Sequence, residues 1–163
     1  MLELGKFARG ARMFAAIAGL LFVAACAQTQ PDGPGSGGNV APGTGQDFVV
    51  NVGDRVFFEE DKSTLNSQGQ ATLDKQAQWL ARYSKYTVTV EGHADERGTR
   101  QYNIALGARR AASARDYLVS RGVDASRIKT ISYGKERPVA VCNDNSCWSQ
   151  NRRAVTVLNN ATN

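Results

Sequence analysis

Acidic and basic side chains gather near the middle of the chain. The acids come first and the arginines follow: Glu91, Asp95 and Glu96, then Arg97, Arg100, Arg109 and Arg110. A carboxylate accepts hydrogen bonds from an ammonium group, and a guanidinium holds a carboxylate through two parallel hydrogen bonds. The pattern therefore favours a site for a zwitterionic ligand, with Asp95 and Arg110 as its two charged ends. The alternative is a structural Asp–Arg pair that fixes a loop to a helix.

Two predicted elements would hold these charges in place. The segment Tyr86–Glu91 alternates apolar and polar residues, which is typical of a half-buried strand, and residues 92–98 form a loop after it. A long helix rich in Arg and Ala is expected from about Tyr102 to Arg121. Gly122 is suited to end it, because glycine adopts a positive φ without strain. The N-terminal end of that helix would add backbone donors beside the acids.

The rest of the predicted fold is of the α+β class, with two long helices on one face of a small mixed sheet. The expected order is strand–helix–strand–helix–strand–strand. The other strands are expected at Phe48–Val52, Arg55–Phe58, Ile128–Tyr133 and Arg153–Leu158. In the first helix, apolar residues recur at helical spacing from Leu73 to Ala81, and Ser67 with Gln70 fits a capping box. Trp79 lies off this apolar stripe and is expected to pack under a loop.

The N-terminal segment, residues 1–25, has the pattern of a signal peptide. Three basic residues, Lys6, Arg9 and Arg12, precede the apolar run Met13–Val23. This run is too short for a stable membrane span, which takes roughly 20 residues, and it suits the apolar region of a signal peptide.

The end of this segment, Val23-Ala24-Ala25-Cys26, resembles the lipobox of bacterial lipoproteins. The resemblance implies cleavage before Cys26, a diacylglycerol on its thiol and acylation of the new amino terminus. Several acyl chains give stable anchoring where one would not. Ala27 follows the cysteine, which by resemblance to Gram-negative lipoproteins favours the outer membrane. The alternative is an ordinary secretory signal in which Cys26 is incidental.

The segment of residues 26–46 is expected to be a flexible linker behind the lipidated cysteine. Glycine and proline dominate it, and it offers almost nothing to bury. Such a linker would give the following domain reach away from its anchor. The folded domain is expected at residues 47–160.

The remaining reactive residues argue against several functions. The formal net charge is +5, but the basic residues are scattered among acids, so no nucleic-acid partner is indicated. His93, the only histidine, lacks a nucleophile with an orienting group and is expected to form hydrogen bonds in its loop. Cys142 and Cys147 do not complete a metal site with one distant histidine. In an exported chain a disulfide between them is expected, and two half-buried free thiols are the alternative.

Several motifs in one order resemble the OmpA-like C-terminal domain family, and in particular its lipid-anchored members. They are Val90–Thr99, Tyr102–Asn103, Leu106–Ala111, Ile131–Pro138 and Asn151–Ala154. The resemblance covers about residues 46–158, and the lipobox and linker agree with it. It implies non-covalent binding of the peptidoglycan stem peptide through meso-diaminopimelate.

The resemblance also implies roles for individual residues of this sequence. Asp95 would hold the ammonium group of the ligand and Arg110 its carboxylate. Asn103 would order the loop or contact the ligand, and Arg97 would reach the peptide. Glu59 lies where relatives have an aspartate and counts among the expected ligand contacts.

Two neighbouring acids are expected to play lesser parts. Glu60 stands where relatives have an apolar residue and is expected to be a solvated turn residue, whereas Asp61 would brace the turn. Replacing Asp95 or Arg110 is expected to remove peptidoglycan binding and leave the fold intact.

By the same resemblance, the chain would be an outer-membrane lipoprotein that tethers the membrane to the cell wall. Its partners would be peptidoglycan, a TolB-like periplasmic protein and other components of the Tol envelope system, with a role in outer-membrane constriction at cell division. No enzymatic activity or cofactor is implied. One alternative is a peptidoglycan hydrolase, which would need a zinc set or an acid–base pair of carboxylates. The other is a structural lipoprotein without a wall ligand.

Overall fold

The computed structural model describes residues 40–159. In chain order the elements are α1 (Gly45–Asp47), η1 (Phe48–Val52), β1 (Arg55–Phe57), α2 (Ser67–Arg82), β2 (Val88–His93), α3 (Arg100–Ser120), η2 (Ala125–Arg127), β3 (Ile128–Gly134), α4 (Asn145–Asn151) and β4 (Arg153–Leu158). The expected signal peptide, the lipobox with Cys26 and most of the expected linker lie outside the described residues.

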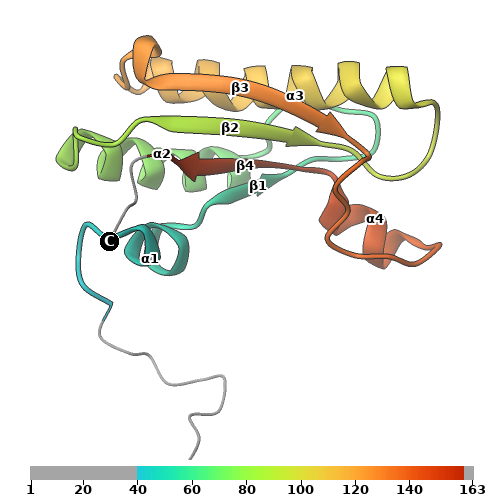
Figure 1. Ribbon diagram of the computed structural model, residues 1–163, viewed down its shortest axis with the longest axis horizontal. Helices are drawn as coiled ribbons and strands as arrows, with labels where there is room; N and C mark the ends of the chain where they lie inside the picture. Colours follow the sequence, from blue (N-terminus) through green and yellow to red (C-terminus); the bar gives the residue numbers. More distant parts are fainter. Residues whose placement is uncertain (1–39, 160–163) are drawn as a thin grey trace, which may run out of the picture. The chain divides into compact units, whose positions relative to one another are not determined.

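The four strands of the described region form one mixed sheet in the order β1-β4-β2-β3. β2 runs parallel to β3, and β4 runs antiparallel to both β1 and β2. The long helices α2 and α3 cover the same face of this sheet (Figure 1). The predicted α+β class and the order of its main elements are confirmed. No helix within residues 40–159 is long and apolar enough to cross a membrane.

Strand β2 lies between β4 and β3 and contributes buried side chains to the core. Its alternation behaves as predicted: Val88 and Val90 are fully buried, whereas Thr89 and Glu91 are partly exposed. The helices meet this strand with apolar side chains, among which Leu73, Leu80 and Leu118 are fully buried. The apolar face of the sheet and the stripes of both helices therefore form one core.

The end of β2 lies unusually close to α3. A Cβ atom on Gly92 would overlap the backbone carbonyl oxygen of Gly107, and a Cβ on Gly107 would overlap the hydroxyl of Ser132. Helix backbone therefore rests directly on strand backbone at this point, which only glycine permits. This contact fixes the loop after β2 against the first half of α3, where the charged residues lie.

The segment Phe48–Val52, which the sequence analysis predicted as a strand, is a helical turn instead. Local caps explain the difference. The Thr44 side chain accepts a hydrogen bond from the amide of Asp47, and the Asp47 carboxylate accepts one from Asn51 Nδ2 at 2.8 Å. These bonds stabilise a helical backbone conformation, and they outweigh the strand preference of the valines.

Asp47 also ties this turn to helix α2. Its carboxylate accepts a hydrogen bond from the indole nitrogen of Trp79 at 2.8 Å and one from the amide of Gly43. Donation from Trp79, and then from Asn51 and Gly43, lowers the pKa of Asp47 below its usual value. Trp79 therefore packs under the N-terminal segment, as expected for a residue beneath a loop.

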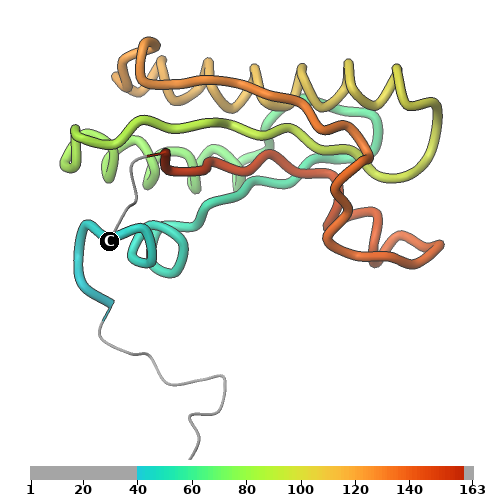
Figure 2. The backbone as a smooth tube through the Cα atoms, viewed as in Figure 1, coloured from blue at the N-terminus to red at the C-terminus, as the bar shows by residue number. Residues whose placement is uncertain are grey.

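The chain contacts the sheet earlier than residue 47, where the sequence analysis placed the start of the domain. The carbonyl oxygen of Gly43 accepts a hydrogen bond from the Tyr86 hydroxyl at 2.8 Å, just before β2 begins. The entering chain is thus held beside the start of β2, whereas the charged loop follows its end. Figure 2 shows the N-terminal segment and α4 at opposite ends of the sheet.

Two helix ends test the capping rules. Helix α2 starts one residue away from the predicted capping box, because the Asn66 side chain accepts from the Gly69 amide at 2.8 Å. Asparagine is a strong N-cap, and Gln70 instead donates to the Leu65 carbonyl. Helix α3 ends at Ser120, and Gly122 has a φ of 91°, as its predicted stop requires.

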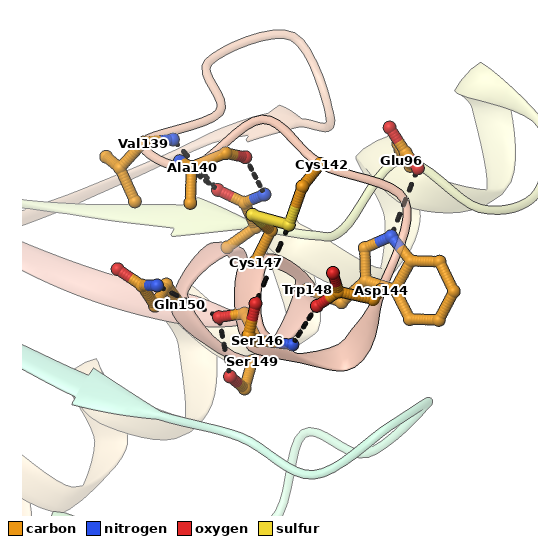
Figure 3. Close-up of a disulfide and its surroundings, with 11 residues drawn as sticks. Glu96, Val139, Ala140, Cys142, Asp144, Ser146, Cys147, Trp148, Ser149 and Gln150 are labelled. Carbon is orange, nitrogen blue, oxygen red and sulfur yellow. Dashed lines mark hydrogen bonds between the residues drawn. A yellow bond between two sulfur atoms is a disulfide. The ribbon is translucent and has the colours of Figure 1, made fainter.

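Helix α4 occupies a segment in which the sequence analysis predicted neither a helix nor a strand (Figure 3). The Asp144 carboxylate accepts from the amide of Ser146 at 2.7 Å and caps this helix. Cys147, in its first turn, forms a disulfide with Cys142, with 5.7 Å between the Cα atoms. A seven-residue helix is too short to persist alone, so the cap and the crosslink account for it.

We expect Gly92→Ala to destabilise the domain strongly. The added methyl group has no room, and α3 would have to move off β2, which should lower the free energy of unfolding by about 3 kcal/mol or more. Urea unfolding followed by circular dichroism would measure it. Gly69→Ala is the matched control, because a Cβ there meets its neighbours at 3.3 Å or more. Equal stability of Gly92→Ala and wild type would contradict this account of the β2–α3 contact.

Candidate functional site

A cavity of about 260 Å³ lies where the loop after β2 meets the first half of α3. Its lining is mostly polar: Glu60, Asp61, Asp95, Arg97, Gly98, Tyr102, Asn103, Leu106 and Arg110. Four of the five ligand contacts expected from the sequence, namely Asp95, Arg97, Asn103 and Arg110, thus come together. Glu59 does not join them, because it lines a different cavity with Phe57 and Arg152.

Arg110 is fully buried and joins three segments of the chain. Its guanidinium donates to three backbone carbonyl oxygens: Nε to Lys62 at 2.8 Å, Nη1 to His93 at 2.8 Å and Nη2 to Glu59 at 3.1 Å. A guanidinium has five N–H donors, so these three carbonyl oxygens do not use all of them. Burial lowers the pKa of Arg110 to about 10, and the group stays charged at neutral pH.

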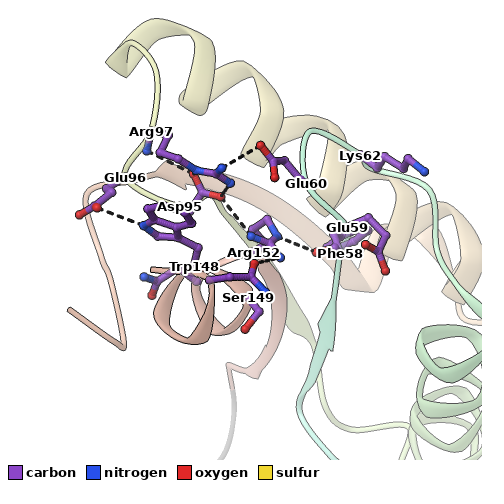
Figure 4. A network of polar contacts seen from close by, with 12 residues as sticks. Phe58, Glu59, Glu60, Lys62, Asp95, Glu96, Arg97, Trp148, Ser149 and Arg152 are labelled. Atoms are coloured by element: carbon purple, nitrogen blue, oxygen red, sulfur yellow. Dashed lines mark hydrogen bonds and ion pairs between the residues drawn. The ribbon is translucent and has the colours of Figure 1, made fainter. Parts of the chain in front are cut away.

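Asp95 receives its hydrogen bonds from two other arginines and none from Arg110 (Figure 4). Arg97 Nη2 donates to Oδ2 at 2.7 Å, and Arg152 Nη1 donates to the same oxygen at 3.4 Å. The amide and Nε of Arg97 lie 3.2 and 3.3 Å from Oδ1. Burial alone would raise the pKa of Asp95, but donation from Arg97 and Arg152 outweighs it, and the pKa is lowered.

The Arg97 guanidinium bridges two carboxylates. Besides Asp95, its Nη1 donates to Glu60 Oε1 at 2.8 Å, and its centre lies 4.2 Å from the ring centroid of Trp148. The hydrogen bonds that Arg97 donates to Asp95 and Glu60 raise the pKa of Arg97 above its usual range. Glu60 is exposed, as expected of a turn residue, but it is also half of this pair. Since its side chain is 66% exposed, the pair contributes little to stability.

Asn103 orders the loop, as expected, because its Nδ2 donates to the carbonyl oxygen of Arg97 at 2.7 Å. The neighbouring Tyr102 hydroxyl donates to the Asp61 carboxylate. Asp61 has a φ of 56°, which is uncommon for a residue other than glycine. Asp61 therefore braces the turn, as expected, and it also forms a wall of the cavity together with Tyr102.

His93 does not play the expected part of a hydrogen-bonding loop residue. It is buried, and within residues 40–159 neither ring nitrogen has a hydrogen-bond partner. Its Nε2 lies 3.7 Å from Glu91 Oε2, and its ring lies against Tyr133. Burial, with smaller contributions from nearby arginines, lowers the pKa of His93 to about 4, so the ring is neutral at neutral pH. The site uses only its backbone oxygen, which accepts from Arg110.

Two contributors were not singled out from the sequence. Arg152 belongs to the Asn151–Ala154 motif, so its motif was noted but its contact with Asp95 was not. Trp148 is a large aromatic residue in a polar segment beside a cysteine, which is an unusual place for it. Within residues 40–159 no group of three or more His, Cys, Asp or Glu side chains is placed to hold a metal ion.

Known proteins similar to this chain agree with each other. The sequence profile of the OmpA family matches residues 57–154. A peptidoglycan-associated lipoprotein of Rhizobium meliloti is 69% identical over 124 residues, which is 76% of this chain and 70% of the relative. One from Mesorhizobium japonicum is 59% identical over 152 residues, or 90% of each chain. The crystal structure of the peptidoglycan-associated lipoprotein of Burkholderia pseudomallei has a TM-score of 0.63 and 40% identity, covering 64% of this chain and 89% of that one.

We expect Arg110→Met to destabilise the domain, contrary to the sequence-based expectation of an intact fold. The variant leaves the carbonyl oxygens of Lys62, His93 and Glu59 without their donor, at a cost of about 3–5 kcal/mol in the free energy of unfolding. Chemical denaturation would measure this change. The neighbouring Arg109 is exposed, so Arg109→Met should change stability by only about 0.5 kcal/mol. Similar values for the two variants would show that these carbonyl contacts do not support the fold.

Proposed function

The chain belongs to the OmpA family, among the peptidoglycan-associated lipoproteins, and we propose that it binds peptidoglycan without cleaving it. In this proposal the protein is anchored to the outer membrane by lipid on Cys26, and its domain faces the periplasm. Bound to both layers, it tethers the outer membrane to the cell wall.

The proposed ligand is meso-diaminopimelate of the stem peptide, which carries ammonium and carboxylate groups. The observation that supports it most is that Asp95 and Arg110 line one cavity and are not bonded to each other. The two N–H donors left on Arg110 suit a carboxylate. At Asp95 one short bond from Arg97 fixes the carboxylate, and the longer ones leave its oxygens able to accept from an ammonium group.

Further residues of the cavity give this ligand its surroundings. Glu60 and Asp61 add negative charge near the proposed ammonium position, and Asn103 holds the loop through the Arg97 backbone. Glu59 contributes to the proposed site only through its carbonyl oxygen, which accepts from Arg110. The side chain of Glu59 is therefore left out of the proposed ligand contacts.

Binding alone, without hydrolysis, agrees with the electrostatics of the site. A glycosidase or amidase would need a protonated acid or an activated water in the cavity. The pKa of Asp95 is lowered rather than raised, after hydrogen bonds from Arg97 outweigh its burial. Incubating purified sacculi with the protein and analysing the soluble products tests this point, and any released muropeptide would favour a hydrolase.

We also assign this chain to the Tol–Pal system, with a TolB-like periplasmic protein as partner and a role in outer-membrane constriction at division. The support is similarity to peptidoglycan-associated lipoproteins along most of the chain. Chemical crosslinking in whole cells, followed by identification of the captured Tol components, would test this assignment.

We expect Asp95→Asn to weaken binding to purified sacculi by about 2–4 kcal/mol in cosedimentation. The amide keeps the shape of the carboxylate but loses the charge that attracts the ammonium group. Arg109→Met, on the exposed side of α3, is the binding control. Wild-type retention of Asp95→Asn would remove Asp95 from the ligand site.

The same carboxylate sets the expected pH dependence. Because the pKa of Asp95 is lowered below its ordinary value of 3.8, the charged form that binds is present throughout the neutral range. Binding should therefore stay constant between about pH 8 and 5 and fall only as the pH passes below about 4. Sedimentation of the protein with sacculi over this range measures it. A loss of binding centred near pH 6 would point to a different titrating group.

We expect Cys26→Ala to release the protein from membranes, because the variant has no thiol at this position to carry the diacylglycerol. Cell fractionation with immunodetection measures the change, and Cys142→Ala serves as the matched control for loss of a cysteine. An unchanged membrane fraction for Cys26→Ala would contradict the lipid anchor.

A further inference from the structure

Helix α4 reaches the candidate site from outside the β2–α3 unit that carries most of it. The helix lies between β3 and β4 in the chain. Trp148 in the helix and Arg152 directly after it approach the loop after β2 (Figure 4). Neither residue lines the cavity itself. Both act on Asp95, one directly and one through Arg97.

Trp148 contacts the Arg97 guanidinium on the surface that its hydrogen bonds leave uncovered. The N–H groups of Arg97 meet the carboxylates of Asp95 and Glu60, and its Cζ atom lies over the Trp148 ring, 4.2 Å from the ring centroid. A cation over an indole ring gains electrostatic attraction. Trp148 is itself oriented by its indole nitrogen, which donates to Glu96 Oε1 at 3.1 Å.

Arg152 follows α4 directly and connects it to Asp95. Its Nη1 donates to Asp95 Oδ2 at 3.4 Å, its Nη2 to Asn145 Oδ1 at 3.3 Å, and its Nε to the Phe58 carbonyl oxygen at 3.1 Å. Arg152 is buried, so these contacts lie largely away from water. The position of α4 therefore affects Asp95 in two ways: directly through Arg152, and indirectly through Trp148 and Arg97.

A disulfide and one asparagine hold α4 in place (Figure 3). Cys147, next to Trp148, is bonded to Cys142 in the preceding loop. The Asn151 side chain accepts from the amides of Val139 and Ala140 and donates to the Ala140 carbonyl oxygen. Because so short a helix is not stable by its own hydrogen bonds, the crosslink beside Trp148 and the Asn151 bonds together support it.

We propose that Trp148 is a positioning residue for the ligand site, and that the Cys142–Cys147 disulfide fixes it there. The proposal rests on the proposed function, because its effect is on peptidoglycan binding. Trp148 does not touch the ligand. It keeps the Arg97 guanidinium on Asp95, so that the carboxylate is oriented and charged before a ligand arrives.

The charges around Asp95 determine the consequence of loosening α4. Asp95 faces three positive charges: Arg97 of its own loop, Arg152 after α4 and Arg110 of α3. Glu60 competes with Asp95 for hydrogen bonds from Arg97. If Arg97 left its place, the buried carboxylate of Asp95 would have weaker donors. Its pKa would then rise, because burial disfavours the charged form. Binding of an ammonium group would weaken and would be lost at a higher pH than in the wild type.

The test compares Trp148→Leu with Trp148→Phe in the full chain, purified from membranes in detergent. The probe is a synthetic stem peptide that ends in meso-diaminopimelate. Trp148→Leu should bind roughly three- to tenfold more weakly, and its loss of binding on acidification should begin at a higher pH. Trp148→Phe keeps a ring under the guanidinium and should restore most of the affinity and the wild-type pH profile.

The disulfide is tested separately. A dithiol reagent gives two electrons and two protons to the Cys142–Cys147 bond, forming two thiols and its own cyclic disulfide. Reduction should shift the affinity and pH profile of the wild type in the direction of Trp148→Leu. It should have no effect on the Cys142→Ser/Cys147→Ser variant, which should already show that shift. In Trp148→Leu, reduction should add little, because both changes act along one route.

A second aromatic–arginine pair provides the control. Arg121 lies 4.9 Å over the Tyr117 ring near the end of α3, far along the helix from the cavity, so Tyr117→Leu should leave binding unchanged. Unfolding curves confirm that each variant is folded. If the wild type does not bind the stem peptide, the proposed function fails. If it binds, and folded Trp148→Leu matches its affinity and pH profile, the positioning role of Trp148 is wrong.

Discussion

The site depends first on one buried cation. The Arg110 guanidinium donates to carbonyl oxygens from the turn after β1 and from the end of β2, and its own backbone belongs to α3. These three segments are separate in the sequence, and the Arg110 side chain joins them beside the polar cavity. Removing an arginine from water is costly unless its donors are satisfied. The backbone carbonyls accept from three of its five N–H groups, and Arg110 also lines the polar cavity.

A second constraint makes the first one possible. The contact of Gly92 with Gly107 brings the α3 backbone onto β2, so that the Arg110 side chain reaches the carbonyl of the last residue of that strand. The absence of a Cβ atom at both glycines thus allows the short distance between the α3 and β2 backbones. At this distance Arg110 can donate to the His93 carbonyl oxygen. The acidic side of the cavity is built differently, since Asp95 depends on arginines from its own loop and from the segment after α4.

Much of this arrangement was predictable, and the remainder follows from contacts that a sequence pattern does not encode. Alternation in β2 and the glycine after α3 correctly predicted a strand and a helix end, because both depend on neighbouring residues. The segment Phe48–Val52 differs from the predicted strand because the local bonds of Thr44 and Asp47 outweigh the strand preference of its valines, and the bond from Trp79 to Asp47 adds a long-range contact that no local pattern contains. The spacing of Asp95 and Arg110 in the sequence predicted that the two residues share a site, and both line one cavity. The spacing did not predict their hydrogen-bond partners. Arg97 lies two residues from Asp95, but Arg152 and the carbonyl oxygens of Lys62 and Glu59 come from remote parts of the chain.

The opposite placement of the entering chain and the cavity has a mechanical consequence. Gly43 is held at the start of β2 by Tyr86, and Asp95 follows its end, so about 20 Å of strand separates the two points. Under the proposed tethering, with lipid at one side and the wall at the other, tension would run along this strand. Its neighbours β3 and β4 are bonded to it along its length, so the load would be shared by all of those bonds in shear instead of breaking them one at a time.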